Sequence, residues 1–416
     1  MSSREGVSIN GGAQVLRPPG DGLPYLRHDR AGELRADAGS LCTSGEAIAA
    51  FETAPEAPTQ IDARGCAVIP GFVDCHTHLP FVGWREREYE MKVAGESYEN
   101  IARTGGGIRS SARALAGASD EEVLRQACEL AAEMLAFGTT TFETKSGYGL
   151  SPEGEIRAIR LAAVLGDRVP QRTTSTALLA HAVPEGQDAD GWMVRVESML
   201  PDVLHAGPVT ALDIYVERVA FTNRHLERMA HLAQGHGLDL RAHVEQFNAN
   251  HSVPVAVAAG ARSVDHLACL PAEEIPALAG SHTAAVLLPG AEFLGQEQLA
   301  PARRLADAGA ICALGTDLNP GTSPVLSMPL VIGLAVRRYG WSVREALLAC
   351  TLNPAWILRR SDSTGSLEVG KRADVLVLDG PIERVPYRLG HNPVGIVLAG
   401  GRVAHVRPDQ AWRVAA

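Results

Sequence analysis

Short β-branched runs alternate with longer helical patterns from residue 68 onward, and this alternation limits the possible folds more than any other feature. A strand that leads into a helix and then into another strand is the repeating unit of parallel α/β folds. Eight units of this kind over about 290 residues are typical of a (β/α)8, or TIM-like, barrel. The runs that fit a strand are 68–74, 139–144, 173–180, 211–217, 239–244, 262–266, 284–288 and 311–316.

The helical patterns between these runs carry clear start and stop signals. Ser119 precedes Glu122 by three residues, which is a capping box, and an apolar stripe follows until Gly138. Ser342 and Glu345 open a second helix in the same way. The alternative fold is a doubly wound open sheet. No glycine-rich dinucleotide fingerprint follows the first strand, however, so the sequence favours the barrel.

The two ends of the chain differ from its middle. Residues 1–67 contain Gly/Pro clusters with short strand-like pieces, and residues 361–416 again have strand patterns. We expect both ends to form one small, discontinuous β-sandwich domain, with the barrel over residues 68–360.

Composition excludes several classes of partner. Of 416 residues, 46% are hydrophobic and 21% are charged, and the net charge of −10 includes no Lys/Arg-rich block. Nucleic acids and anionic membranes attract a positive surface, so neither is expected as a partner. The seven cysteines are dispersed without a Cys-x-x-Cys pair. Together with the lack of an apolar leader at the N-terminus, they predict reduced thiols and a cytoplasmic protein.

The first predicted strand ends in His76 and His78, which are separated by one residue. Alternate side chains of a strand lie on the same face, so both imidazoles should point the same way. In a barrel the active site gathers at the carboxyl ends of the strands. The other strand ends add further candidate side chains, namely Glu143, Lys145, His181, Glu217, His243, Glu245, Gln246, His266 and Asp317.

Three imidazoles and one carboxylate suit a divalent ion such as Zn²⁺ or Fe²⁺. Such an ion lowers the pKa of a bound water and yields a nucleophile at neutral pH. We predict one ion with His76, His78, His243 and Asp317 as ligands, and His266 as the group that moves a proton or polarises a carbonyl.

At these residues the chain resembles the amidohydrolase superfamily, and most closely its imidazolonepropionase family, from about residue 66 to 403. The resemblance rests on specific motifs along the whole barrel. They are Phe72-Val-Asp-Cys-His-Thr-His-Leu-Pro-Phe-Val-Gly-Trp-Arg85, Gly105-Gly-Gly-Ile108, Thr144-Lys-Ser-Gly-Tyr-Gly-Leu150, Ala180-His-Ala-Val-Pro184, Asp265-His-Leu267, Leu287-Leu-Pro-Gly290, Gly315-Thr-Asp-Leu-Asn-Pro-Gly-Thr-Ser-Pro324, Ser327-Met-Pro329 and the closing Gly365-Ser-Leu-Glu-Val-Gly-Lys-Arg-Ala-Asp374.

The resemblance implies a metal-dependent hydrolysis of 4-imidazolone-5-propanoate to N-formimino-L-glutamate, in histidine degradation, by a homodimer. It also implies roles for substrate-binding residues. Arg85 and Tyr148 match contacts to the substrate carboxylate, and a guanidinium fits a carboxylate through two parallel hydrogen bonds. Further matches to the substrate pocket are Tyr98, His181, Asn319, Gly321 and Thr322.

One position departs from many ring-opening and deaminating relatives. They carry a proton-shuttling Glu three residues after the histidine of the fifth strand, where this chain has Gln246. Glu245 shares the strand face of His243 on an alternating pattern, so we expect Glu245 and Gln246 to take part in the site with His266 and Asp317. The alternatives are another cyclic amidohydrolase or a heterocycle deaminase, and a catalytically silent metal-binding scaffold.

Overall fold

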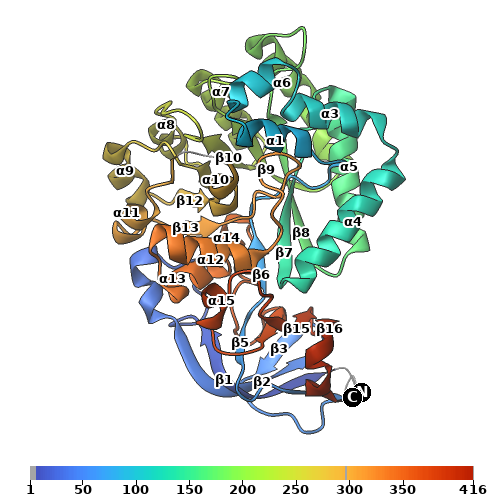
Figure 1. Cartoon of the computed structure of the whole chain (residues 1–416), viewed down its shortest axis with the longest axis vertical. Helices are drawn as coiled ribbons and strands as arrows, with labels where there is room; N and C mark the ends of the chain where they lie inside the picture. Colours follow the sequence, from blue (N-terminus) through green and yellow to red (C-terminus); the bar gives the residue numbers. More distant parts are fainter. Residues whose placement is uncertain (1–5, 296–297, 416) are drawn as a thin grey trace.

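The computed structural model describes residues 6–295 and 298–415, apart from the side chains of residues 98, 99 and 102. Its central element is a sheet of eight parallel strands that neighbour one another in chain order (Figure 1). A parallel bridge between Thr77 and Leu318 joins the two ends of this sheet, so it closes as a barrel, as predicted. The strands are β6 (Phe72–Asp74), β7 (Thr139–Lys145), β8 (Arg172–Ala180), β9 (Val209–Tyr215), β10 (Asp239–Val244), β11 (Ser263–His266), β12 (Ala284–Leu287) and β13 (Cys312–Leu314).

The helices begin and end near the predicted signals. The Ser119 hydroxyl accepts a hydrogen bond from the backbone N–H of Glu122 (3.2 Å), and Ser342 and Glu345 cap each other reciprocally. The barrel segment contains α1 (Glu86–Val93), α2 (Tyr98–Arg103), α3 (Ile108–Gly117), α4 (Asp120–Ala136), α5 (Pro152–Arg168), α6 (Ala189–Ala206), α7 (Asn223–Gly235), α8 (Val253–Ala258), α9 (Ile275–Ala279), α10 (Pro289–Gly295), α11 (Ala302–Asp307), α12 (Met328–Tyr339), α13 (Val343–Ala349) and α14 (Leu352–Ile357).

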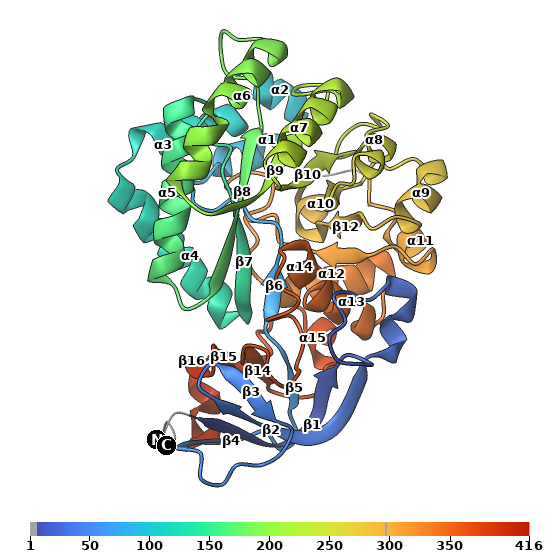
Figure 2. The same cartoon turned by 180° about the vertical axis from the view of Figure 1, so that it is seen from behind.

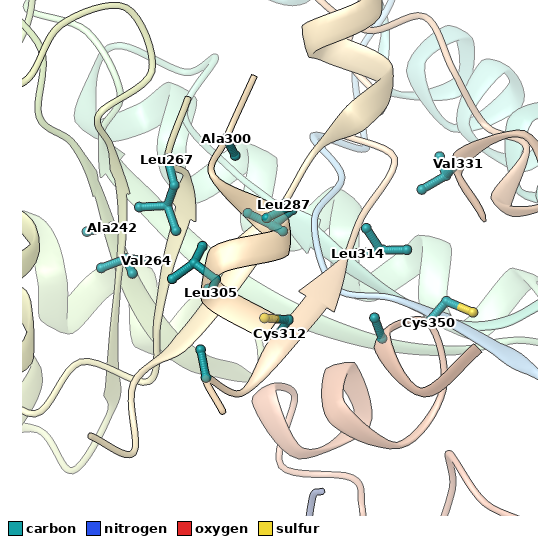
Figure 3. Packing of buried hydrophobic residues seen from close by; sticks show 14 of the residues in the cluster. Ala242, Val264, Leu267, Leu287, Ala300, Leu305, Cys312, Leu314, Val331 and Cys350 are labelled. Atoms are coloured by element: carbon teal, nitrogen blue, oxygen red, sulfur yellow. The ribbon is translucent and has the colours of Figure 1, made fainter. Parts of the chain in front are cut away.

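Apolar side chains from strands and helices form the main core between the barrel and its helical layer. Figure 3 shows Leu287 of β12, Leu305 of α11 and Leu314 of β13 in this cluster, all of them fully buried. Burying one such side chain stabilises the fold by about 1.5–3 kcal/mol. None of the helices in the described part of the chain has the length and apolarity that crossing a membrane requires.

The predicted strand 68–74 is wrong in one respect, because it is two strands. β5 (Ala67–Pro70) pairs with β1 (Val7–Arg17) and β14 (Val375–Leu378), whereas β6 pairs with β7 in the barrel. The chain passes between the two sheets at Gly71, where a Cβ atom would lie 2.0 Å from the hydroxyl of Thr140. A side chain at this position would therefore separate the first barrel strand from its neighbour.

The second sheet has nine strands, from the beginning and the end of the chain, and lies beside the amino ends of the barrel strands (Figure 2). Its core contains the buried side chains of Ile9, Leu41, Val375 and Ile396. This sheet agrees with the predicted small β domain, while the domain limits at 67/68 and 360/361 stay a prediction. Its other strands are β2 (Arg35–Ser44), β3 (Ala47–Ala50), β4 (Thr59–Asp62), β15 (Val394–Ala399), β16 (Arg402–Val406) and β17 (Val414–Ala415), and α15 (Arg384–Tyr387) lies between β14 and β15.

A buried histidine near the junction of the two parts should make the fold sensitive to acid. His28 is 1% exposed, its ring lies 4.2 Å from that of Trp341, and burial lowers its pKa to about 3 from the usual 6.5. The folded state therefore keeps this ring neutral while the unfolded chain takes up a proton below pH 6.5. Between that pH and about pH 3, His28 should reduce the free energy of unfolding by about 1.4 kcal/mol per pH unit.

Urea unfolding of a His28→Phe variant from about pH 7 to pH 4 tests this expectation, because phenylalanine keeps the aromatic contact but does not titrate. The variant should lose stability less steeply than the wild type. The exposed His231→Phe substitution serves as the control and should leave the slope unchanged. Equal slopes for the wild type and the His28 variant would contradict the assignment.

Candidate active site

The carboxyl ends of the barrel strands bring four histidines and one aspartate together. The imidazole of His76 lies 4.5 Å from that of His243 and 5.6 Å from that of His266, measured between ring centroids. The Nε2 atoms of His76 and His78 lie 3.5 and 3.2 Å from Oδ1 of Asp317. All five side chains are buried. The cluster therefore forms one compact group, although its members come from four separate strands.

Backbone conformation helps to aim two of these side chains. His266 (φ +83°) and Asp317 (φ +54°) both occupy the left-handed region, which non-glycine residues rarely adopt. Each such residue costs about 1–3 kcal/mol and persists only where its surroundings hold it. The Asp317 backbone N–H is held by the carbonyl of His76 (2.9 Å), across the seam where the barrel closes.

Several atoms of this cluster fit a divalent metal ion. His76 donates through Nδ1 to Asp265 (2.6 Å), and His243 donates through Nδ1 to Asp213 (3.1 Å). Both rings thereby keep an Nε2 lone pair that has no hydrogen-bond partner among the described residues, and the same holds for Oδ2 of Asp317. Nδ1-bonded imidazoles with a free Nε2 are the usual form of metal-binding histidine. The metal-ligating atoms of His76, His78 and Asp317 all lie within 4.8 Å of one another.

Electrostatics keep the imidazoles in the form that binds a cation. Burial lowers the pKa of His266 to about 3 and lowers the pKa values of His76 and His78 well below 6.5, so all three rings are neutral at pH 7. Burial also raises the pKa of Asp317 above its ordinary value, which favours a carboxylate that exchanges a proton more readily than an exposed one. Metal binding requires deprotonated ligands, and these rings meet that condition.

A cavity of about 30 Å³ is lined by members of this cluster and by most of the predicted site residues. It shares Ile108, His181 and Tyr215 with a neighbouring cavity of about 240 Å³. Tyr98 begins α2, but its side chain lies outside the described part of the structure. The residues that line the smaller cavity are His78, Arg85, Ile108, Tyr148, His181, Tyr215, His243, Gln246, His266, Asp317, Asn319 and Thr322.

Arg85 reaches this cavity with hydrogen-bonding capacity to spare. Its side chain is only 7% exposed, and its Nε and Nη1 atoms make no hydrogen bond to the described residues, although Glu88 lies 3.6 Å from Nε. A buried guanidinium is costly unless an anion accepts its hydrogen bonds. The arrangement therefore favours a ligand whose carboxylate lies beside Arg85.

Gly321 is not among the residues that line the cavity, and its predicted substrate contact stays a prediction, but it holds Arg85 in place. A Cβ atom at Gly321 would lie 1.6 Å from Nη2 of Arg85, so the guanidinium rests directly on the glycine backbone. The Asn319 side chain shapes this turn, because its Oδ1 accepts hydrogen bonds from the backbone N–H groups of Gly321 (2.9 Å) and Thr322 (2.7 Å).

The expected orientation of Glu245 towards the site is wrong. β10 ends at Val244, and Glu245 has φ +53°, so the alternation of the strand stops before this residue. Its carboxylate accepts hydrogen bonds from the backbone N–H groups of Asn250 and Ser252, both at 2.6 Å. Glu245 therefore stabilises the loop after β10, whereas Gln246 lines the cavity.

The sequence did not identify Asp213 and Asp265 as part of the site, although both orient metal-facing imidazoles. A signal for them exists, because each is the one carboxylate within a short strand, β9 for Asp213 and β11 for Asp265. Charged side chains are rarely fully buried without a partner, so an acidic residue inside such a strand indicates a buried polar network.

Comparisons with known proteins agree with this geometry. The model of the amidohydrolase family matches residues 67–406. The imidazolonepropionase of Rubrobacter xylanophilus is 43% identical over 402 residues, covering 93% of this chain and 95% of that protein. The imidazolonepropionase of Deinococcus radiodurans is 43% identical over 84% of this chain and 87% of its own length.

Solved structures share the fold at low sequence identity. A zinc-bound adenosine deaminase from Xanthomonas campestris superposes with a TM-score of 0.69 at 20% identity, covering 96% of this chain and 93% of its own. A triazine hydrolase variant gives a TM-score of 0.73 at 18% identity, with 96% and 94% covered. The match to the family model and the close relatives over most of the chain show that this protein belongs to the imidazolonepropionase family of amidohydrolases.

Proposed function

We propose that this protein hydrolyses the cyclic amide C–N bond of 4-imidazolone-5-propanoate to give N-formimino-L-glutamate, a step of histidine degradation. The observation that carries the proposal is that one cavity is lined both by the metal-facing side chains and by Arg85. The Nε and Nη1 atoms of Arg85 make no hydrogen bond to the described residues, so they are available to an acceptor. A small ring that bears a carboxylate matches both features.

His76, His78, His243 and Asp317 would hold one metal ion, for which we propose Zn²⁺ or Fe²⁺. Such an ion supplies a water whose pKa is low enough to attack an amide carbonyl at neutral pH. Oδ2 of Asp317 accepts a proton from the attacking water and returns it to the ring nitrogen that leaves. His266 lines the cavity as a neutral ring and donates a hydrogen bond to the substrate carbonyl oxygen.

The remaining cavity residues bind and orient the substrate. Arg85 and Tyr148 contact the propanoate, and His181, which donates through Nδ1 to the carbonyl of Gly147 (3.1 Å), presents Nε2 to the ring. Gln246 positions the ring or the water, because a carboxamide cannot exchange a proton near neutral pH. Asn319 and Thr322 contact the amino-acid-like end of the substrate, and we place Tyr98 in the same pocket.

Two alternatives are less well supported by the site. A deaminase needs an acid that protonates the departing ammonia, and Gln246 at the cavity wall cannot do this. A silent scaffold has no use for a buried guanidinium with two nitrogens that make no hydrogen bond to the described residues. We further propose that the enzyme acts as a cytoplasmic homodimer, as the family resemblance implies.

A coupled assay tests the proposed reaction directly. Urocanate and urocanase generate the unstable imidazolone in place, and its absorbance decay is followed with and without the purified, metal-replete protein. We expect fast decay that a chelator abolishes, with formiminoglutamate as the product. Decay no faster than the spontaneous reaction would exclude this substrate, and a screen of other carboxylate-bearing cyclic amides would follow.

A further inference from the structure

A chain of buried charges lies beneath the imidazoles, and the proposed reaction does not use it. The Lys145 ammonium lies 2.7 Å from Oδ2 of Asp213 and 3.0 Å from Oε2 of Glu143. Arg241 pairs with the other oxygen of Glu143 and, through Nη2, with Asp265 at 2.7 Å. All five side chains are at most 1% exposed.

This chain connects two metal-facing histidines to each other. Asp213 accepts the Nδ1 hydrogen bond of His243, and Asp265 accepts that of His76. Each of these carboxylates is in turn held by a cation, Lys145 on one side and Arg241 on the other. Glu143 joins the two cations, so a continuous series of contacts runs from one imidazole to the other.

Further hydrogen bonds restrict the side chains of this network of buried charges. Arg241 donates through Nε to Ser263 (2.9 Å), and the Ser263 hydroxyl donates to Oδ1 of Asp265 (2.6 Å). Thr176 donates to Glu143, and the backbone N–H of Ile214 donates to Asp213. The carboxylates are therefore fixed from several directions, and with them the direction in which each Nε2 lone pair points.

The charges are also matched to the ion. Glu143, Asp213, Asp265 and Asp317 are four carboxylates, whereas Lys145 and Arg241 are two cations, which leaves a net charge of minus two among these side chains. One divalent cation neutralises this excess. Burial and the neighbouring Arg241 lower the pKa of Lys145, but Asp213 and Glu143 outweigh them and keep the ammonium charged.

We propose that Lys145 and Arg241, joined through Glu143, are positioning residues that hold Asp213 and Asp265 against the imidazoles of His243 and His76 and so adapt the site to a single divalent ion. The ion pairs of Lys145 use its side chain as a charged ammonium. They therefore favour this role over that of a carbamylated lysine, which would bridge two metal ions. The inference rests on the proposed metal site, but it does not depend on which ring the enzyme opens.

Metal affinity tests the proposal without any substrate. Wild-type protein and a Lys145→Met variant are stripped and then titrated with Zn²⁺ against a chromophoric chelator, and bound metal is counted by mass spectrometry. We expect one ion per wild-type chain and a dissociation constant raised about 10- to 100-fold in the variant, the usual cost of losing a group that orients a ligand. The spectrum of Co²⁺-loaded protein should change as well.

Two further variants separate positioning from general destabilisation. Arg372→Met breaks a comparable ion pair with Asp374 in the small β domain, and it should lower stability without changing metal affinity. A double variant with Lys145→Met and Glu143→Gln removes one positive and one negative charge, so it leaves the buried net charge unchanged. It replaces the single variant in the metal titration if that variant does not fold. We expect weakened metal binding here too, since Asp213 loses its ammonium donor.

A folded Lys145 variant, single or double, with wild-type metal affinity and an unchanged Co²⁺ spectrum would overturn the proposal. A wild-type protein that binds no metal would overturn it together with the proposed metal site. Metal binding that behaves as expected, without turnover of the imidazolone, would leave this inference standing and reject the proposed substrate alone.

Discussion

Replacing Asp317 by asparagine is expected to remove both metal binding and turnover. Asp317 is the carboxylate of the cluster, and its Oδ1 atom lies 3.2–3.5 Å from the Nε2 atoms of His78 and His76. Asparagine keeps the shape but offers a neutral oxygen, which binds a divalent cation more weakly and cannot accept a proton from water. Losing a group that acts on the reacting atoms lowers kcat by about 10²–10³-fold, and loss of the ion should add to this.

Metal content and turnover are measured together for this variant. The exposed Asp202→Asn substitution on α6 serves as the control and should leave both quantities unchanged. An Asp317→Asn variant that keeps one tightly bound ion and full activity would show that the site is assigned wrongly. A variant that keeps the ion but loses activity would restrict Asp317 to proton transfer.

The barrel and the cluster could be predicted from sequence because their signals are local. The eight strand patterns fell close to the eight observed strands, since alternation of strand and helix depends on neighbouring residues. His76, His78, His243, His266 and Asp317 each stand at a strand end, and the carboxyl ends of parallel strands meet at one face of a barrel. Position in the fold was therefore enough to bring them together.

Three features of the structure could not be predicted from the sequence, because they depend on backbone geometry beyond the strand ends and on contacts with distant parts of the chain. Glu245 was expected to alternate with His243, but a positive φ turns its side chain into its own loop. The split of the first predicted strand at Gly71 depends on partners far away in the chain, because β5 pairs with β1 and β14 whereas β6 pairs with β7. The roles of Asp213 and Asp265 likewise depend on side chains of other strands, which a single-strand pattern does not contain.

Arg85→Met is expected to raise KM for the imidazolone about 10- to 100-fold, because hydrogen bonds to a charged group contribute about 1.5–3 kcal/mol. Methionine retains much of the aliphatic volume but removes the guanidinium that lines the cavity. The neighbouring Arg87→Met substitution on α1 is the matched control, since the exposed Arg87 does not line that cavity. Unchanged KM in the Arg85 variant would contradict the carboxylate contact.

Gly321→Ala should reproduce much of this effect while leaving the guanidinium in the protein. The added methyl group would lie 1.6 Å from Nη2 of Arg85, so the guanidinium must move away from the backbone of Gly321. Gly235→Ala, at a position where a Cβ atom meets nothing within 4 Å, is the control for glycine substitution itself. If KM rises in the Gly321 variant, a double variant with Gly321→Ala and Arg85→Met is compared with Arg85→Met alone. The two should have nearly the same KM, because both changes remove the same contact. Fully additive effects would mean that Gly321 acts on the substrate independently of Arg85.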